Sequence, residues 1–287
     1  MHSHIQIFSN EILQKKYAKP TISAKKALLV GANSEIAQSI QNEFLDLGIE
    51  LFLTYNKEIR ADQFPCYQLD LTNAQSIDNL LEQFKRENLL FDVVVICSGI
   101  MEYPQEKFEE LSWAEIEKVY RVNLIGPHYF MARFSQIMNP ESSYVILSGG
   151  GASGPMKYFP SYSASKTGLI RLIETISLEL FSDGINVNAL GPGPIASPMT
   201  LNLIENETLP PQILSSIKLQ IPGKFGFFNS EFTAKCVAIL ISNEMKAVSG
   251  KFFSAQWDDW SDLGKLAAEA SSCSTNFTLR RVGCEVN

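Results

Sequence analysis

The sequence predicts a single α/β domain built on a doubly wound, Rossmann-type parallel sheet of seven strands, with helices on both faces. From residue 26 onward, short apolar runs alternate with amphipathic stretches of helical length, the usual pattern of a parallel sheet wrapped by helices. Runs such as Val93–Ile96 are continuously apolar, as strands covered on both faces require. With 45% hydrophobic and 19% charged residues, the 287-residue chain has enough apolar material for such a core.

The seven expected strands are short, and turn residues or the start of a helix bound them. In chain order they cover Ala27–Val30, Leu51–Thr54, Pro65–Leu69, Val93–Cys97, Tyr144–Leu147, Ile185–Leu190 and Phe252–Ala255. Between the first two, apolar residues recur at helical spacing and predict a helix that ends before Gly48. Further helices are expected over 73–87, 107–137, 162–182 and 230–242, so strands and helices alternate along the chain.

The ends of the chain differ in composition from its middle. Residues 1–25 are polar with scattered apolar positions, and residues 262–287 are rich in serine, threonine and small side chains. The predicted domain therefore covers residues 26–261, and we expect the two terminal extensions to lie outside its core.

Charge and cysteine content argue against several classes of protein. The 24 Lys and Arg against 31 Asp and Glu give a net charge of −7, which offers no general attraction for nucleic acid or anionic membranes. Three histidines and five cysteines without a C-x-x-C pair do not form the usual zinc sites, so no metal is expected. No signal-peptide core and no run of about 18 apolar residues is present, which predicts a cytoplasmic protein.

The turn after the first strand is a candidate phosphate site. The strand runs into Gly31–Ala37, where backbone amides at the start of a helix can hold a phosphate group. The common fingerprint G-x-G-x-x-G is absent, and a glycine before a helix often serves only as a turn residue. The turn alone therefore leaves both interpretations open.

Tyr162 and Lys166 lie four residues apart at the start of an amphipathic helix and therefore share one of its faces. Reduction of a carbonyl needs an acid that gives a proton to the oxygen, and a phenol with a pKa of about 10 is poorly matched to neutral pH. A neighbouring ammonium group favours the phenolate and lowers that pKa. An exposed aromatic–cation pair is the alternative explanation of this spacing.

In their order along the chain, these motifs resemble those of the short-chain dehydrogenases/reductases. Gly31–Ala37 resembles the family's T-G-x-x-x-G-x-G turn, with Glu35 and Ala37 in place of the second and third glycines, and Tyr162–Lys166 resembles its Y-x-x-x-K motif. The resemblance covers about residues 26–255. It implies an NAD(P)-dependent oxidoreductase that moves a hydride to or from the carbonyl or alcohol carbon of a small molecule, and a homodimer or homotetramer.

The resemblance also implies a proton-transfer machinery. Tyr162 would be the general acid/base, while Lys166 would tune it and hold the nicotinamide ribose. Asn123, in Val122–Gly126, resembles the family's buried asparagine, which keeps a water between the lysine and solvent. Because Pro127 lacks an N–H, the carbonyl of Asn123 loses its helical partner and is free for a water, although a plain helix irregularity is the alternative.

A serine that polarises the substrate oxygen is expected after the fifth strand. Ser148 is our candidate, at the start of Ser148–Gly151. The family's serine-to-tyrosine separation is one residue shorter than the 14 positions from Ser148 to Tyr162, so Gly149 would occupy the serine's place unless the glycine run absorbs an insertion. Ser153 is the second candidate.

Cofactor contacts are implied at the strand ends and in the proline–glycine turn after the sixth strand. Asp70 resembles the family's aspartate beside the adenine ring, with a helix N-cap as the alternative role. Ser197 would replace the family's threonine beside the nicotinamide carboxamide. The full set is Gly31, Asn33, Ser34, Ile36, Tyr55, Asn56, Asp70, Leu71, Ser98, Gly99, Tyr162, Lys166, Pro192, Gly193, Ile195 and Ser197.

The segment after the second strand bears on the choice between the two nicotinamide cofactors. An NAD-preferring site places an acidic residue near Tyr55 to accept a hydrogen bond from the ribose 2′-hydroxyl. Here Asn56 and Lys57 follow instead, which favours NADP(H) over NAD(H). A solvated turn lysine is the alternative reading of Lys57.

The substrate side carries no motif that identifies a substrate. The resemblance implies a mobile lid over residues 198–228, and candidates for an apolar pocket are Met156, Tyr158, Phe159 and Met199. Trp257–Trp260 departs from the family's usual V-D-G-G ending and is expected to serve in packing or in a subunit contact. Two other functions stay open: an epimerase or dehydratase of a nucleotide-linked sugar, and a dinucleotide-binding regulatory protein without turnover.

Overall fold

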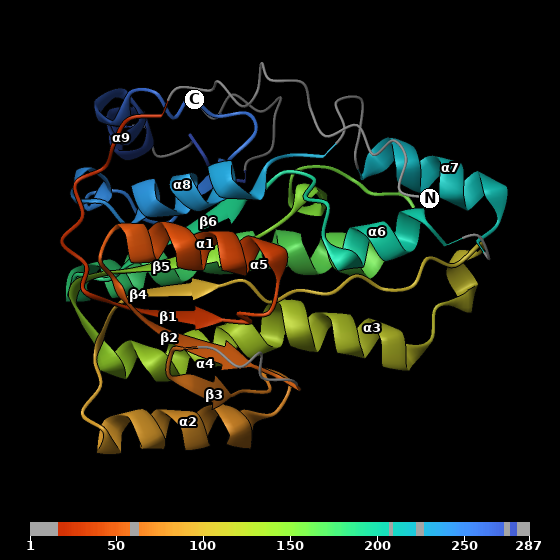
Figure 1. Ribbon diagram of the computed structural model, residues 1–287. Helices are drawn as coiled ribbons and strands as arrows, with labels where there is room; N and C mark the ends of the chain where they lie inside the picture. The colour runs from red at the N-terminus through yellow and green to blue at the C-terminus, as the bar shows by residue number, and fades with distance from the viewer. Residues whose placement is uncertain (1–16, 58–62, 207–208, 222–226, 273–275, 280–287) are drawn as a thin grey trace, which may run out of the picture.

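The computed structural model describes residues 17–57, 63–206, 209–221, 227–272 and 276–279, and a parallel sheet runs through its centre (Figure 1). The seven strands lie in the order β3-β2-β1-β4-β5-β6-β7, and all the pairings between them are parallel. The predicted fold class is therefore confirmed. The strands are β1 (Lys26–Val30), β2 (Glu50–Tyr55), β3 (Cys66–Gln68), β4 (Phe91–Ile96), β5 (Met138–Leu147), β6 (Asn186–Gly191) and β7 (Phe252–Ser254).

Helices cover both faces of the sheet, with α1 and α8 above it and α2 and α4 below it in Figure 1. The helix expected over 107–137 is interrupted: α3 and α4 are separated by a π-helical turn at Arg121–Ile125. The helices are α1 (Glu35–Asp46), α2 (Ala74–Arg86), α3 (Trp113–Tyr120), α4 (Gly126–Phe134), α5 (Pro160–Leu180), α6 (Pro198–Ile204), α7 (Pro211–Gln220), α8 (Ser230–Leu240) and α9 (Leu263–Ser272).

Two apolar clusters, one on each face, hold the helices to the sheet. Because side chains of a strand alternate between faces, Leu29 packs with α1 and α8, while its neighbour Leu28 packs with α2, α4 and α5. Both side chains are fully buried. This burial on both faces explains why the strands are read as continuous apolar runs.

Helix α9 belongs to the core, so the prediction that the C-terminal extension lies outside it is wrong for this helix. Leu263, Leu266 and Ala270 are buried in the same cluster as α1 and α8. On the N-terminal side, the Ala18 N–H donates to the carbonyl of Trp260 at 3.1 Å. Residues 1–16 of the N-terminal extension lie outside the described residues.

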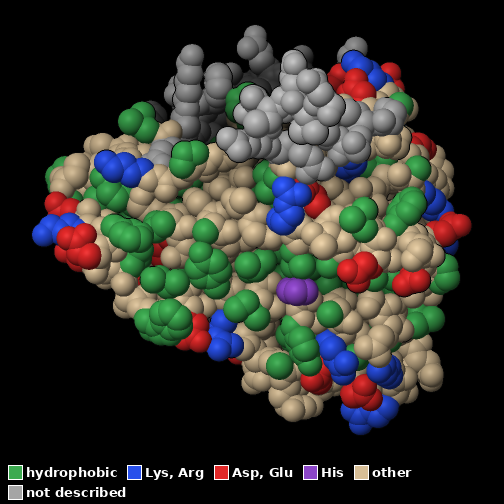
Figure 2. All heavy atoms as spheres, turned by 180° about the vertical axis from the view of Figure 1, so that it is seen from behind, with side chains coloured by type: hydrophobic (Ala, Val, Ile, Leu, Met, Phe, Trp, Pro, Cys, Tyr) green, Lys and Arg blue, Asp and Glu red, His purple; other side chains and the backbone are tan. Residues whose placement is uncertain are grey.

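The carboxyl ends of all seven strands meet at one edge of the sheet because the strands are parallel. From β1 the strand order continues outward to β2 and β3, and from its neighbour β4 it continues outward on the other side to β5, β6 and β7. Ligands of such sheets bind outside the strand ends, between the two strands where the order reverses. The loops after β1, β4, β5 and β6 therefore share one edge. Away from it, on the face seen in Figure 2, basic and acidic side chains are interspersed among apolar ones.

Candidate active site

The turn between β1 and α1 combines a glycine of positive φ with a capped helix start. Gly31 has a φ of +83°, and a Cβ there would collide with Oγ of Ser98 at the end of the neighbouring strand. Ser34 is the N-cap of α1 and accepts a hydrogen bond from the N–H of Ala37 at 3.2 Å. The free amides at the start of α1 therefore point out of the sheet edge.

The two replaced glycines are accommodated without filling this turn. Glu35 is exposed, so its carboxylate lies in solvent, and Ala37 is fully buried against the sheet. The side chain of Ile36, one of the expected cofactor contacts, is buried in the core, which leaves only its backbone for a ligand. Asn33 is half-buried in the same turn.

The expected ribose and adenine contacts line the ends of β2 and β3. Tyr55 is half-buried, while Asn56 and Lys57 are exposed. The carboxylate of Asp70 accepts from both the N–H and the hydroxyl of Thr72, at 2.8 and 2.7 Å, and so shapes its own turn. Leu71 is buried beside it.

The N-cap of α2 is Asn73, whose side chain accepts from the N–H groups of Gln75 and Ser76. The alternative reading of Asp70 as that N-cap is therefore wrong. The Asp70 carboxylate holds the preceding turn instead, which leaves its role beside an adenine ring as an expectation.

The loop after β4 joins the turn after β1 to the start of α5. Ser98 donates from Oγ to the carbonyl of Val30 at 3.4 Å. A Cβ on Gly99 would lie 3.1 Å from Nζ of Lys166, so the backbone here lies directly against the lysine. The predicted cofactor residues Ser98 and Gly99 thus lie between the end of β1 and the start of α5.

Tyr162 and Lys166 are both buried at the start of α5, with 7% and 3% of their surfaces exposed. Nζ of Lys166 donates to the carbonyl of Leu147 at 3.1 Å and lies 6.0 Å from the centre of the Tyr162 ring. This burial lowers the pKa of Lys166 to about 8. The alternative of an exposed aromatic–cation pair is excluded, because neither side chain is exposed.

The pKa of Tyr162 is raised to about 12 by burial and, second, by the negative charge of Glu102. The ammonium group of Lys166 donates to a strand carbonyl, and its expected lowering of the phenol's pKa stays a prediction. Glu102 is an acid that the sequence pattern did not reveal.

Asn123 lies inside the π-helical turn and is fully buried. Its side-chain amide exchanges two hydrogen bonds with the backbone of Ile100, at 2.9 and 2.8 Å, and donates to Oγ of Ser165 at 3.0 Å. Ser165 in turn donates to the carbonyl of Tyr162 at 2.8 Å. Asn123 therefore links the loop after β4 to the first turn of α5, and the helix irregularity expected at Pro127 is present.

The position that faces the tyrosine hydroxyl is Gly149, and this corrects the choice of Ser148. A Cβ on Gly149 would collide with the hydroxyl oxygen of Tyr162 and lie 3.1 Å from its Cζ. Ser148 is 4% exposed, and its Oγ has no hydrogen-bond partner among the described residues. Successive residues of an extended segment point to opposite sides, so Ser148 faces away from Tyr162. Ser153 is exposed and donates to the carbonyl of Gly150.

The turn after β6 lies against the segment that precedes α8. Gly193 has a φ of +80°, and a Cβ there would lie 3.2 Å from Cβ of Phe228. Ile195 is buried, and its carbonyl accepts from Oγ1 of Thr200 at 2.7 Å. Ser197 is the N-cap of α6, and the carbonyl of Pro192 accepts from Thr233. Ile195 and Ser197, two of the expected cofactor contacts, thus stabilise the start of α6.

Glu102 is the residue of this site that sequence reasoning missed. Its carboxylate is 3% exposed and accepts from the N–H groups of Ser161 and Tyr162, at 2.6 and 2.9 Å. The nominal N-cap residue of α5, Phe159, makes no side-chain cap. A helix start without a capping side chain is visible in the sequence. The sequence does not indicate that an acid 60 residues upstream accepts the hydrogen bonds of that helix start.

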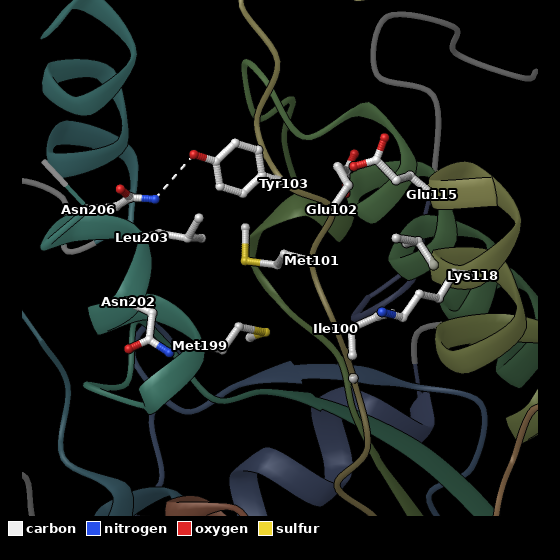
Figure 3. A pocket seen from close by; sticks show the side chains of 12 residues that line it. Ile100, Met101, Glu102, Tyr103, Glu115, Lys118, Met199, Asn202, Leu203 and Asn206 are labelled. Atoms are coloured by element: carbon white, nitrogen blue, oxygen red, sulfur yellow. Dashed lines mark hydrogen bonds between the residues drawn. The ribbon is translucent and has the colours of Figure 1, made fainter. Parts of the chain in front are cut away.

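A cavity of about 480 Å³ opens beside these residues, lined by the loop after β4, by α3 and by α6 (Figure 3). Met101 from the loop and Met199 and Leu203 from α6 point toward one another across it. Asn206 donates to the hydroxyl of Tyr103 at 3.2 Å and closes its rim. Met199 is the one predicted pocket residue that lines this cavity. The other three candidates do not line it and pack in an apolar cluster that shares Met101 and Leu203 with the cavity wall; they are Met156, Tyr158 and Phe159.

The second half of the expected lid folds as α7, and residues 207–208 and 222–226 lie outside the described residues. Of the two tryptophans near the end of the sheet, Trp260 is buried against Phe253 and donates from Nε1 to the carbonyl of Ser254 at 3.1 Å. Trp257 is 68% exposed. Trp260 therefore serves in packing, which is one of its two expected roles.

In the described part of the chain, no group of three or more histidine, cysteine, aspartate or glutamate side chains is placed to hold a metal ion. In the same residues, no helix combines the length and the apolar character needed to cross a membrane.

Comparison with known proteins gives consistent matches over this fold. A family model described as enoyl-(acyl carrier protein) reductase matches residues 31–255. The 3-oxoacyl-[acyl-carrier-protein] reductase FabG of Haemophilus influenzae is 27% identical over 80% of this chain and 95% of its own. BdcA in complex with NADPH superposes with a TM-score of 0.68 at 18% identity, covering 82% of this chain and 93% of its own. 4-Hydroxyisoleucine dehydrogenase complexed with NADH superposes with a TM-score of 0.69 at 23% identity, covering 80% of this chain and 96% of its own.

Proposed function

Because the chain belongs to the short-chain dehydrogenase/reductase family and is an NAD(P)-dependent oxidoreductase, we propose that Tyr162 is its acid/base. The phenol would exchange a proton with the carbonyl or alcohol oxygen of a small-molecule substrate while a hydride moves to or from the carbon. One observation carries this proposal: Tyr162 and Lys166 are buried together at the start of α5, directly behind the loop that lines the cavity. The substrate would therefore enter through that cavity.

The dinucleotide would be held along the sheet edge, and it supplies the hydride when bound. Amides at the start of α1 would face its phosphates, and the exposed position of Glu35 keeps the carboxylate out of that turn. Asp70 would contact the adenine, Lys166 the ribose and Ser197 the carboxamide. The close approach of Gly31 to Ser98 leaves the strand ends free of bulky side chains, which fits a cofactor lying across them.

We also propose that NADP(H) binds in preference to NAD(H). The two described residues that follow Tyr55 at the end of β2, Asn56 and Lys57, are exposed and not acidic, and they would lie near a 2′-phosphate. Fluorescence titration with NADPH and NADH tests this, with the tighter Kd expected for NADPH. A lower Kd for NADH would overturn the reading of this segment, and Lys57→Ala should weaken NADPH binding selectively.

Asn123 would act with Tyr162 as a positioning residue and proton relay. The side chain of Asn123 is already hydrogen-bonded to Ile100 and Ser165. The group that can hold a water would therefore be its backbone carbonyl, four residues before Pro127, which has no N–H to donate. Ser148 is not retained as the oxygen-polarising residue. With Gly149 in that position, the substrate oxygen would be bound by the tyrosine hydroxyl without a serine partner.

A dinucleotide-binding regulatory protein without turnover is the second candidate function, and the glycine at position 149 is the observation that favours it. The two candidates differ in whether the nicotinamide is oxidised. A panel of carbonyl compounds and alcohols, followed by the nicotinamide absorbance with both cofactors, separates them.

The assignment of the acid is tested by Tyr162→Phe. We expect kcat/KM for carbonyl reduction to fall by about 10²- to 10⁴-fold, while the Kd of the dinucleotide changes little. Tyr129→Phe is the matched control, because it removes a hydroxyl of α4 that donates to Asp78 of α2. Turnover by Tyr162→Phe at the wild-type rate would refute the assignment.

We propose a homodimer or homotetramer as the working form. Apolar side chains of α5 and of the turn before α4 are exposed, among them Leu178 at 81%, Phe181 and Ile125. Scattered apolar residues are common on surfaces, but three on adjoining helices favour a contact with a second copy. Sedimentation equilibrium measures the mass, and Leu178→Glu should reduce it to that of a monomer.

A further inference from the structure

The cavity beside the start of α5 is apolar where α6 faces the loop after β4. Met101 of the loop and Met199 and Leu203 of α6 extend toward one another there, and we call these three side chains the apolar wall (Figure 3). Methionine has several rotatable bonds and a polarizable thioether, so it adapts to apolar molecules of different shape. The apolar wall therefore suits an apolar ligand without fixing its exact outline.

Most polar side chains of this cavity are already bonded to protein groups. The carboxylate of Glu102 accepts N–H groups at the start of α5. The carboxylate of Glu115 accepts from Oγ of Ser112 at 2.9 Å, and the amide of Asn206 donates to the hydroxyl of Tyr103 at 3.2 Å. A polyhydroxylated molecule that entered would lose its hydrogen bonds to water and find few open partners in return.

The charges of the lining disfavour an anion. The carboxylates of Glu102 and Glu115 stand against one ammonium group, that of Lys118. Because Lys118 lies three positions after Glu115 on α3, the two side chains share one helix face and their charges offset each other. The negative charge of buried Glu102 remains. A carboxylate or phosphate brought beside it would be repelled, and more strongly than in bulk water.

The size of the cavity agrees with a small molecule. Its volume of about 480 Å³ lies in the range of pockets that hold small ligands. A nucleotide-linked sugar, which the sequence leaves open, carries a polyhydroxylated ring and a charged diphosphate. Neither part matches the apolar wall or the charge of the lining.

We propose that the substrate is an uncharged, largely apolar ketone or aldehyde, and that Met101, Met199 and Leu203 determine this specificity. The inference rests on the proposed function, in which the substrate enters through this cavity. In that reaction the carbonyl carbon receives the hydride of the reduced dinucleotide and the oxygen receives the phenolic proton of Tyr162, which yields an alcohol and the oxidised dinucleotide. Contact with the apolar wall removes the rest of the substrate from water.

The test compares two pairs of ketones with the full-length protein and either reduced cofactor. Methyl hexyl ketone is apolar, whereas erythrulose is polyhydroxylated. Methyl levulinate is uncharged, whereas levulinate is the corresponding anion. We expect kcat/KM to be higher by about tenfold or more for methyl hexyl ketone than for erythrulose, and for methyl levulinate than for levulinate.

Met199→Gln places a polar side chain of similar length in the apolar wall. Because 37% of the Met199 surface is exposed, this change leaves the core intact. We expect kcat/KM for methyl hexyl ketone to fall by about five- to twentyfold, mainly through KM, while the value for erythrulose stays within about twofold. Met101→Gln is the second variant of the wall. Met156→Gln is the matched control, because Met156 is half-buried nearby but does not line the cavity.

Glu115→Gln tests the effect of charge. Glutamine can still cap the start of α3, but it leaves the ammonium group of Lys118 without its offset. We expect kcat/KM for levulinate to rise relative to methyl levulinate by about two- to fivefold. Glu110→Gln is the matched control, because Glu110 caps the preceding short helix by accepting the N–H of Lys107 and does not line the cavity.

Binding of methyl hexyl ketone is measured separately by saturation-transfer nuclear magnetic resonance, which needs no turnover. A higher kcat/KM for erythrulose or levulinate than for its partner would overturn the proposed substrate class and leave the oxidoreductase in place. Equal effects of Met199→Gln and Met156→Gln, or no binding of the ketone, would also overturn it. Binding that Met199→Gln weakens, without oxidation of the nicotinamide, would support the specificity of the cavity and refute the proposed function.

Discussion

The cofactor turn and the catalytic strand end have both lost residues of the family pattern, but the structure responds differently at each. After β1, Glu35 and Ala37 replace two glycines, and the turn keeps the positive φ of Gly31 and the Ser34 cap. After β5, the expected serine is absent, and the Tyr162 hydroxyl lies so close to Gly149 that no side chain fits there.

The difference follows from what each site is made of. A phosphate site at a helix start uses backbone N–H groups, which every residue except proline supplies. The expected partner of the substrate oxygen after β5 is instead a single side-chain hydroxyl, which only a few residue types supply. Substitutions that leave the backbone geometry unchanged are therefore expected to have small effects in the turn, whereas side-chain changes beside Tyr162 should have large ones.

Lys166→Met should have the largest effect, with opposite signs on activity and stability. Because burial lowers the lysine pKa from 10.5 to about 8, the folded protein loses this proton before the unfolded chain does, so its stability rises with pH between these values. Below pH 8 the buried charge destabilises the fold. We expect Lys166→Met to raise the free energy of unfolding at pH 7 by about 1 to 3 kcal/mol and to reduce kcat by about 10²-fold or more.

Urea unfolding at pH 7 and pH 10 measures the stability effect, and the gain from Lys166→Met should shrink at the higher pH. The carbonyl of Leu147 loses its donor in the variant, which limits the gain. A destabilised variant at pH 7 would show that the hydrogen bond outweighs the buried charge.

Gly149→Ser tests the catalytic side of the comparison directly. The new Cβ would collide with the tyrosine hydroxyl, so Tyr162 must turn away, and we expect kcat to fall about tenfold or more. Gly150→Ser is the matched control, because no atom lies within 4 Å of a Cβ there. Steady-state kinetics measures both; increased activity in Gly149→Ser would mean that the site accepts the family's serine.

Gly31→Ala tests the turn, where backbone geometry is required. The positive φ and the collision with Ser98 are expected to lower the free energy of unfolding by about 2 to 3 kcal/mol. Gly48→Ala has a similar φ of +74° but open space around its Cβ, so only the backbone strain of about 1 kcal/mol is expected. Equal losses in the two variants would contradict the role of the close approach to Ser98.

Glu35→Gln should have the smallest effect, because the side chain is exposed and screened by solvent. Removal of its charge from the first turn of α1 is expected to tighten the Kd of the dinucleotide by about twofold at low salt. Asp46→Asn at the other end of the helix is the control. A large change in Kd would place the Glu35 carboxylate at the phosphates.

The sequence predicted the fold well because strand burial on both faces leaves continuous apolar runs, as in β4. The sequence predicted one helix over 107–137, because the spacing of apolar residues in α3 and α4 does not show that a single π-helical turn separates them. Lys166, Tyr162 and Asn123 could be located from motif spacing. Ser148 could not be decided that way, because a one-residue offset becomes visible only when the directions of neighbouring side chains are known.

Glu102 was beyond sequence reasoning for a different reason. Its two helix partners lie about 60 positions later in the chain, and only the fold brings them together. The residues of α9 were assigned to the outside, because a composition rich in small residues hides the few apolar positions that complete the core.

The contact between Ala18 and Trp260 also decides how the protein responds to mechanical force. Tension applied between these two points is carried first by one backbone hydrogen bond and by the packing of Trp260 on Phe253. A pulling experiment should therefore record a low-force opening of this clasp before the main rupture, with the Tyr162–Lys166 pair still in place.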